Sequence, residues 1–305
     1  MLRYYVALLV LGSIWGSNFI FMKWSTELIS PMQTVMLRVL SGFIPLLIVA
    51  LYRRQIHTGQ LKYLLHFAVM SVLATTFYYY GFVAGTALIP TSIAGLLSGT
   101  IPIFTFICAF LFLRQDRPTF QMLLGVMVGF IGIVISTKPW EGAEGVNVVG
   151  VLWMLAGTTS LGISFVYAQR QLSSLKLPPV ALATWQTGCA SLTLLVLTDF
   201  SGITNVAADL KTLLGLVIGL GIFGTGGAFF LYYYVIEKLG SVKASGGTYI
   251  APVVAVVIGA FVGEKMDASI ALALILILGG VILIQTGKHK TPRPVDSPVH
   301  SASID

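Results

Sequence analysis

The sequence contains very few charged residues. Lysine, arginine, aspartate and glutamate make up 10% of its 305 residues, whereas a soluble domain usually contains about a quarter. Apolar residues make up 56%, and the mean hydropathy is +0.91. So few charges cannot cover a water-facing surface, which excludes a soluble enzyme, a nucleic-acid-binding protein and a disordered chain. The protein is therefore expected to lie in a lipid bilayer.

Cysteine and catalytic motifs are also scarce. The two cysteines, Cys108 and Cys189, both lie in apolar runs, where they are expected to pack as small hydrophobic side chains rather than form a disulfide or a metal site. The sequence has no H-E-x-x-H, no G-x-S-x-G and no pair of carboxylates within an apolar run. A membrane-embedded enzyme is the least favoured class, and no cofactor or metal ion is expected.

Ten apolar runs are each long enough to cross a bilayer, which takes about 20 residues of helix. They lie at 4–22, 32–52, 61–82, 91–113, 119–136, 148–169, 179–198, 210–236, 244–263 and 268–286. The loops between them are short and contain turn and charge signals, which leaves no room for a soluble domain. Residues 288–305 are rich in Lys, His, Pro and Ser and are predicted to form a disordered cytoplasmic tail.

Basic residues are distributed unevenly between the two sides of the membrane. Of the 18 Lys and Arg residues, Arg38 lies inside a run and thirteen lie on the side of the N-terminus. Four lie in loops on the opposite side: Lys23, Lys138, Lys211 and Lys265. Because cytoplasmic loops carry the excess of positive charge, both termini are predicted to be cytoplasmic.

The two halves of the sequence resemble each other. Corresponding residues occur in the same order in both halves: Gly16 and Gly162, Arg38 and Gln186, the tyrosine triplets 78–80 and 232–234, Ala94 and Ala244, and Pro102 and Pro252. Five helices cross a membrane an odd number of times, so the second copy must enter from the opposite side. The prediction is an all-α membrane protein with ten transmembrane helices, arranged as two inverted five-helix repeats at 1–138 and 147–287. Such repeats enclose a substrate site near the midplane.

Arg38 is the one ionisable residue clearly inside an apolar run, about 10 Å from the outer end of its helix. Two interpretations stay open. Arg38 either binds an anionic group of a substrate or gates the outer vestibule, or it extends outward and bonds a carbonyl or Glu27. No carboxylate lies at the centre of a run, which disfavours a proton-driven mechanism but leaves one through Glu264 open.

Aromatic and small polar residues inside the runs suggest a cavity suited to a small amphiphilic solute or an organic cation. The alternative is that the tyrosines belong to the aromatic belts at the membrane interfaces. The candidate substrate-binding residues are Trp15, Asn18, Arg38, Tyr78, Tyr79, Ser98, Ser164, Trp185, Gln186, Tyr232, Thr248 and Tyr249.

Glycines suggest where helices approach each other closely. Glycines precede both Pro102 and Pro252, and such segments serve either as gating hinges or as close packing sites. Gly125, Gly129 and Gly132 have helical spacing, and their face of the fifth span is assigned to helix packing.

The arrangement resembles the EamA-like family of the drug/metabolite transporter superfamily. The segments that carry the resemblance are Trp15 to Phe19 with Lys23, Pro31 to Arg38, Ala94 to Pro102, Gln121 to Gly132, and Ala244 through Pro252 to Lys265. It implies a cavity lined by the first four helices of each half, with the fifth and tenth at the periphery. The family often has a glutamate twelve residues after each proline. Glu264 keeps it, but Arg114 replaces it in the first half, so Glu264 is expected to be a helix-end contact.

The expected function is a secondary transporter of small metabolites that works by alternating access. Export of amino acids or related amphiphilic solutes across a bacterial inner membrane is favoured. Uptake of a small metabolite or of an organic cation such as choline is the alternative, and a channel is disfavoured. The expected partners are a small-molecule substrate and the lipid bilayer, with no nucleic acid, and a homo-oligomer is left open.

Overall fold

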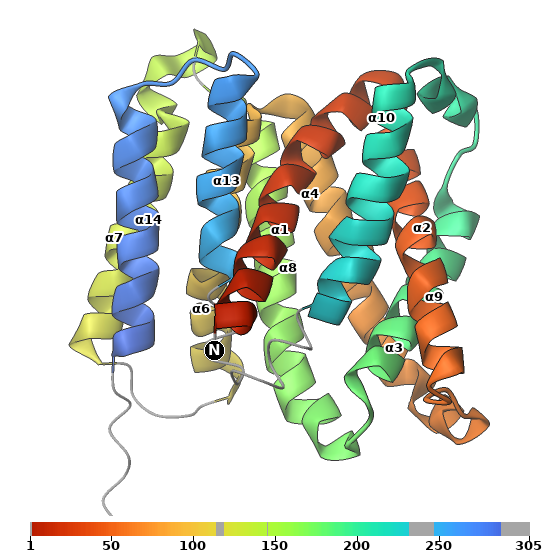
Figure 1. The fold of residues 1–305 in the computed structure, drawn as a ribbon. Coiled ribbons are helices and arrows are strands. Elements are labelled where there is room, and N and C mark those ends of the chain that lie inside the picture. Colours follow the sequence, from red (N-terminus) through yellow and green to blue (C-terminus); the bar gives the residue numbers. More distant parts are fainter. Residues whose placement is uncertain (1, 114–118, 145, 232–246, 288–305) are drawn as a thin grey trace, which may run out of the picture.

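The computed structural model describes residues 2–113, 119–144, 146–231 and 247–287. Every regular element within these residues is a helix (Figure 1). Nine of the described segments are long and apolar enough to cross a membrane, and a tenth apolar helix, α13, is shorter. The prediction of an all-α protein with ten transmembrane helices in two inverted repeats is confirmed. The predicted tail at 288–305 lies outside the described residues.

The first half contributes five spans, of which the third and fourth consist of several helical segments. Its elements are α1 (Leu2–Leu28), α2 (Pro31–Tyr52), η1 (Thr58–Tyr63), α3 (Leu64–Ser71), η2 (Val72–Thr76), α4 (Phe77–Leu88), α5 (Thr91–Ser98), α6 (Ile101–Leu113) and α7 (Phe120–Thr137). The segments η1, α3, η2 and α4 form the third span, and η2 is a single π-helical turn within it. The fourth span is α5 followed by α6.

The second half repeats this order. Its elements are α8 (Val148–Tyr167), η4 (Ala168–Leu172), α9 (Pro179–Leu197), α10 (Leu210–Leu214), η7 (Gly215–Gly227), α13 (Gly247–Phe261) and α14 (Ala268–Thr286). The short helices η3 (Pro139–Glu144), η5 (Ser173–Leu175) and η6 (Ile203–Ala208) lie in the connections. The segment η7 is π-helical, like its counterpart η2 in the first half.

Helix α1 extends beyond its predicted end at Met22 and stops at Leu28. The reason is the position of Lys23, which the sequence suggested as a loop residue. Its ammonium group donates hydrogen bonds to the carbonyl oxygens of Ala87 at 3.0 Å and Ile89 at 3.3 Å. These carbonyls belong to the end of α4, where backbone acceptors lack partners within the helix. Because these carbonyl oxygens accept the hydrogen bonds of the Lys23 ammonium group, α1 can continue past Lys23 to Leu28.

The start of α2 follows from local chemistry. Ser30 accepts a hydrogen bond from the backbone N–H of Gln33, and the Gln33 side chain accepts one from the backbone N–H of Ser30. This reciprocal pair satisfies two backbone donors at the helix start. Pro31 occupies the first turn, where a missing N–H costs nothing.

The packing between the halves occurs in equivalent pairs. Helix α1 packs against α13 and α8 packs against α6, while α2 packs against η7 and α9 packs against α3. A Cβ added at Gly16 would lie 2.6 Å from the Cβ of Val254, and one added at Gly162 would lie 3.0 Å from the backbone of Phe104. Val254 and Phe104 each follow the matching proline by two residues. The paired contacts are those of an inverted repeat.

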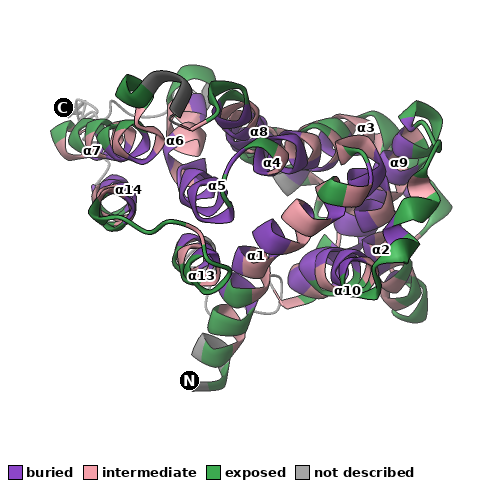
Figure 2. Ribbon diagram, turned by 90° about the horizontal axis from the view of Figure 1, so that it is seen from above, coloured by how far each residue is buried: buried purple, intermediate pink, exposed green. Residues whose placement is uncertain are grey.

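Helices α7 and α14 pack against each other at the edge of the bundle (Figure 2). A Cβ added at Gly125 would lie 2.5 Å from the carbonyl oxygen of Gly280, and one added at Gly280 would lie 2.5 Å from that of Gly125. The packing role predicted for the glycines of the fifth span is confirmed, as is the peripheral place of this pair.

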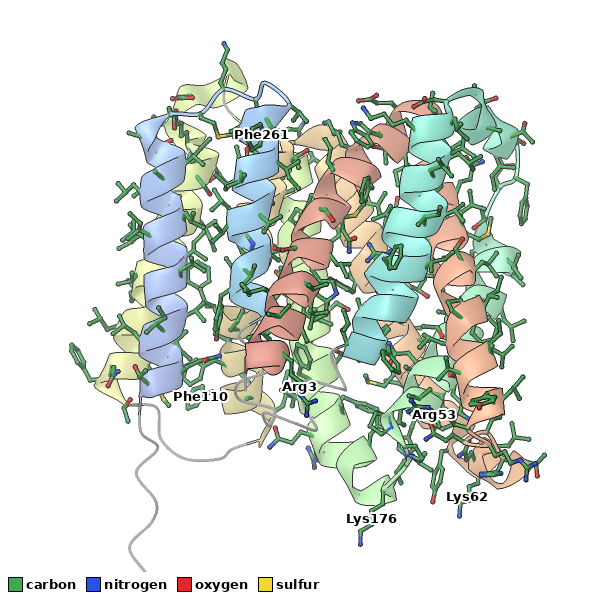
Figure 3. The ribbon with its side chains drawn as sticks, viewed as in Figure 1. Arg3, Arg53, Lys62, Phe110, Lys176 and Phe261 are labelled. Atoms are coloured by element: carbon green, nitrogen blue, oxygen red, sulfur yellow. The ribbon has the colours of Figure 1, made fainter. Side chains whose placement is uncertain are left out.

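The two ends of the bundle differ in charge. Figure 3 shows Arg3, Arg53, Lys62 and Lys176 at the lower end of the molecule, opposite Phe261 at the upper end. Helix α1 begins and α14 ends at the lower end (Figure 1). We call the two ends lower and upper below.

Candidate substrate site

Arg38 is buried at the interface between the two halves. It lies on α2 and is 3% exposed. Its Nε donates a hydrogen bond to the hydroxyl of Thr225 on η7 at 3.3 Å, and its Nη1 lies 3.8 Å from the sulfur of Met22 on α1. The Thr225 hydroxyl donates its own hydrogen to the carbonyl of Leu220, so it meets Arg38 as an acceptor. Helices from both halves therefore hold the guanidinium.

Tyr79 on α4 covers one face of the same guanidinium. The Cζ atom of Arg38 lies 3.8 Å from the centroid of the Tyr79 ring, within the range of a cation–π interaction. The Tyr78 ring lies beside it with centroids 4.9 Å apart and meets the Phe82 ring edge-on at 4.5 Å. Tyr79 is buried and Tyr78 is half-buried, so the two rings form an aromatic wall beside the charge.

Asn18 on α1 completes this cluster. The hydrogen-bond network assigns the orientation of its amide. The amide nitrogen donates to the carbonyl of Ile14 at 3.0 Å, and the amide oxygen accepts from Nη2 of Arg38 at 3.2 Å. We call Asn18, Met22, Arg38, Tyr78, Tyr79 and Thr225 the Arg38 cluster. Four of its six members are among the predicted site residues.

The interpretation that Arg38 extends outward to a carbonyl or to Glu27 is wrong. Glu27 is exposed, and the guanidinium turns instead toward Thr225, Asn18 and Tyr79. Hydroxyl, amide and aromatic groups at the helix interface solvate the charge, so it does not need to reach the end of the helix.

A second cluster occupies the equivalent place in the other half. Gln186 on α9 is buried, and its Nε2 donates to the hydroxyl of Thr75 on η2 at 2.8 Å. Trp185, next to it, donates from Nε1 to the Oε1 of Gln60 at 2.6 Å and stacks on Phe67 with ring centroids 5.6 Å apart. The predicted residues Trp185 and Gln186 thus lie together, in a cluster of their own.

The two threonines, which are not among the predicted site residues, occupy equivalent positions. Thr75 and Thr225 lie 150 residues apart, as do Pro102 and Pro252. Both threonines lie in the π-helical segments, and both accept from the residue that follows the helix-opening proline by seven positions. The second tyrosine triplet, at 232–234, lies outside the described residues. The spacing of the prolines is the signal that identifies the threonine pair.

Other predicted site residues form bonds within their own helices or pack in the interior. Ser98 and Ser164 are buried, and their hydroxyls donate to the carbonyls of Gly95 and Leu161 in their own helices. Tyr249 is half-buried and packs beside the apolar cluster of α6 and α14.

The structure describes the last three predicted site residues only in part. Trp15 is half-buried, about one turn before Asn18 on α1. Thr248 lies in α13, but its side chain is outside the described part of the chain, as is all of Tyr232. In the described residues, Cys108 and Cys189 are free thiols, as predicted.

At the upper end, Glu264 joins the halves by capping a helix of the other half. Its two carboxylate oxygens accept hydrogen bonds from the backbone N–H groups of Thr91 at 2.6 Å and Ser92 at 2.9 Å. These are the first residues of α5, which begins after Pro90 with no local side-chain cap. A carboxylate at a helix N-terminus is favourable because it meets free N–H groups and the positive end of the helix dipole. The prediction that Glu264 is a helix-end contact is confirmed.

The turn that directs the Glu264 side chain toward α5 depends on Gly263. Gly263 has φ +84°, a left-handed conformation that glycine adopts without strain. The backbone N–H of Glu264 donates to the carbonyl of Gly259 at 3.0 Å, which is the bond that closes a Schellman motif. Helix α13 therefore ends in a reversal that returns the carboxylate toward α5.

Further contacts between the halves lie at the upper end. The Nε2 of Gln33 donates to the carbonyls of Asp199 at 2.7 Å and Ser201 at 2.9 Å. The Nζ of Lys211 lies 3.7 Å from the centroid of the Trp24 ring. With Glu264, these contacts hold α1, α2 and α5 to the second half.

Lys138 and Asp267 form an ion pair between the loops at the upper end. The hydrogen bond from Lys138 lowers the pKa of Asp267 from 3.8 to about 2, and the same bond raises the pKa of Lys138. Because the carboxyl pKa is depressed by folding, the stabilisation is present above about pH 4 and is lost as the pH falls toward 2.

We expect acidification from about pH 5 to about pH 3 to lower the thermal stability of wild-type protein in detergent more than that of Asp267→Asn. The asparagine keeps an oxygen for the Ser269 and Ile270 N–H groups that Asp267 now caps but removes the titrating charge. Equal acid sensitivity of the two proteins would contradict the assignment.

Among the described residues, no group of three or more His, Cys, Asp or Glu side chains is arranged to hold a metal ion. The groups that meet at the interface of the halves are instead a cation, an amide, a hydroxyl and aromatic rings. They are suited to holding an organic solute by hydrogen bonds, charge and stacking.

The fold, two inverted bundles with polar groups between them, is that of a multi-pass membrane transporter. The chain belongs to the EamA-like transporter family, whose model matches residues 2–138 and 148–286. The resemblance inferred from the sequence motifs is thereby confirmed.

Individual relatives agree with this assignment. The chain is 29% identical to "Uncharacterized inner membrane transporter YedA" of Escherichia coli K12, over 98% of this chain and 96% of that protein. It is 24% identical to an "Uncharacterized transporter" of Archaeoglobus fulgidus, over 85% of this chain and 89% of that protein. One crystal structure, 22% identical in sequence, has the same fold with a TM-score of 0.61 over 92% of this chain and 96% of the other. Family and relatives indicate a transporter rather than an enzyme.

Proposed function

We propose that the protein is a secondary transporter that exports amino acids or related amphiphilic solutes across a bacterial inner membrane by alternating access. The observation that carries the proposal is the Arg38 cluster, in which charged, polar and aromatic groups of both halves meet inside the membrane-spanning region. Groups buried between two inverted repeats are placed where relative movement of the halves would change their access to either side.

We also propose that the lower end faces the cytoplasm. Arg3, Arg53, Lys62 and Lys176 all lie there (Figure 3), and cytoplasmic loops of membrane proteins carry the excess of basic residues. In this orientation both termini are cytoplasmic, and the contacts of Glu264 and Gln33 lie toward the outside.

An organic cation such as choline is the less favoured substrate. Aromatic walls bind quaternary ammonium groups, but the face of Tyr79 is already occupied by the guanidinium of Arg38. A second cation at this wall would meet a like charge in a medium of low dielectric constant.

Counterflow in proteoliposomes tests the transporter and its site together. We expect purified wild-type protein to exchange at least one labelled amino acid from a panel, and Asn18→Ala and Tyr79→Ala to reduce this exchange about tenfold or more. The reason is that each variant removes a contact worth about 1 to 2 kcal/mol from the Arg38 cluster.

The matched control is Phe120→Ala, which truncates an aromatic ring that is 81% exposed on the peripheral helix α7. It should exchange like the wild type. No exchange of any amino acid by the wild type would overturn the proposed function, and wild-type rates in both cluster variants would remove the cluster from the site. Accumulation in inverted vesicles then gives the direction.

A further inference from the structure

The charge of Arg38 has no counter-ion among the described residues. The ion pairs in that part of the chain join Lys138 to Glu141 and to Asp267. The partners of Arg38 are a hydroxyl, a thioether, an amide oxygen and an aromatic ring, all of them neutral. A buried cation in a membrane is costly, and such residues usually pair with an opposite charge.

The other half of the protein shows that the structural bond does not require the charge. Gln186 is the counterpart of Arg38, and it makes the same bridge to a threonine of a π-helical segment with a shorter bond, 2.8 Å against 3.3 Å. A neutral amide therefore suffices to join these two helices. The positive charge of Arg38 is unnecessary for the fold at this position.

The guanidinium also has unused donors. Of its five N–H groups, one faces Thr225, one faces the weak acceptor sulfur of Met22, and one faces Asn18. Two N–H groups remain without a partner in the described residues. One of them is on Nη1 and the other on Nη2, and N–H groups on the two terminal nitrogens of a planar guanidinium are donors that carboxylates and phosphates bind.

We propose that Arg38 is the residue that binds the carboxylate of the transported solute, with the Tyr78 and Tyr79 rings beside the apolar part of that solute. The inference rests on the proposed function and names its substrate class. A carboxylate is favoured over a phosphate because the cluster offers a single cation, which matches a monoanion. A dianionic phosphate would leave a net negative charge in a region of low dielectric constant.

The variant that tests this inference is Arg38→Gln, because glutamine already occupies the equivalent position of the second half. Folding should be retained for that reason, and the thermal stability in detergent checks it. Arg38→Lys keeps the charge without the fork of donors. Lys62→Gln, which removes an exposed positive charge at the lower end, is the matched control.

The readout is the preference for an acid over its amide. Counterflow of the best-exchanged labelled amino acid is competed with phenylacetate, phenylacetamide, phenethylamine and phenyl phosphate. In wild type and Lys62→Gln, we expect phenylacetate to compete and the amide and the amine to fail. In Arg38→Gln, exchange should fall about 100-fold and the preference for the acid should disappear, with Arg38→Lys intermediate.

Thermal stabilisation of detergent-solubilised protein by the same four compounds separates failure of this inference from failure of the proposed function. If wild type exchanges nothing but is stabilised by phenylacetate in an Arg38-dependent way, carboxylate binding by Arg38 stands and the transport proposal fails. Equal competition by acid and amide, unchanged exchange in a folded Arg38→Gln, preference for phenyl phosphate, or neither exchange nor stabilisation would each overturn it.

Discussion

Replacing Gly280 by leucine is expected to separate α14 from α7 and to leave little folded protein in the membrane. A Cβ at this position would lie 2.5 Å from the carbonyl oxygen of Gly125 and 2.8 Å from the backbone nitrogen of Gly129. These atoms are backbone and cannot rotate away, so the helices must move apart. Overpacking of this kind costs about 3 kcal/mol or more. The yield of monodisperse protein in detergent and its thermal midpoint measure the effect.

The neighbouring residue supplies the control. A Cβ added at Gly279 meets nothing within 4 Å, so Gly279→Leu adds the same side chain to the same helix without a clash. We expect this variant to match the wild type in yield and midpoint. If the two variants behaved alike, the loss would reflect helix propensity or expression rather than the contact between α7 and α14.

Replacing Glu264 by glutamine is expected to lower the free energy of unfolding by about 2 kcal/mol, because one of the two charge-assisted hydrogen bonds to the start of α5 is lost and the other becomes a weaker, neutral bond. The amide can offer one oxygen to the N–H groups of Thr91 and Ser92, and its NH₂ group would face donors. Thermal unfolding in detergent measures the loss. Glu27→Gln, which alters an exposed carboxylate of α1 at the same end, should be neutral.

The same substitution should also loosen the upper end. Spin labels at Leu88 and Phe261, which are both exposed, report the distance between the end of α4 and the end of α13. We expect a broader distance distribution in Glu264→Gln than in Glu27→Gln. If neither the distance distribution nor the thermal stability changed, the hydrogen bonds of Glu264 would not hold the two halves together.

Much of the fold could be predicted because its signals are local. Apolar runs predict spans whatever their neighbours are, and Ser30, Pro31 and Gln33 carry the start of α2 within four residues. The alignment of Gly16 with Gly162 is supported by their contacts. Gly16 meets α13, which contains Pro252, and Gly162 meets α6, which contains Pro102. The end of α1 was missed because it depends on carbonyl acceptors more than sixty residues away along the chain.

The site was harder to predict because it depends on register. A π-helical turn changes which residues of a helix face a neighbour, and the apolar pattern of η2 and η7 does not reveal that change. The sequence pattern therefore did not single out Thr75 and Thr225. The direction of the Arg38 side chain could not be predicted either, because it depends on a hydrogen bond to η7, an element of the other half.

Arg38 and Gln186 occupy equivalent positions but differ in charge, which has a consequence for the two orientations of the proposed alternating-access cycle. If the two halves were identical, a two-fold rotation would convert the state open to one side into the state open to the other, and the two states would have the same energy. A cation in one half and a neutral amide in the other remove that degeneracy. Water and the membrane potential then act on a charge in one repeat that has no counterpart in the other. In the proposed transport cycle, this pair of unlike residues contributes to a difference in energy between the two orientations.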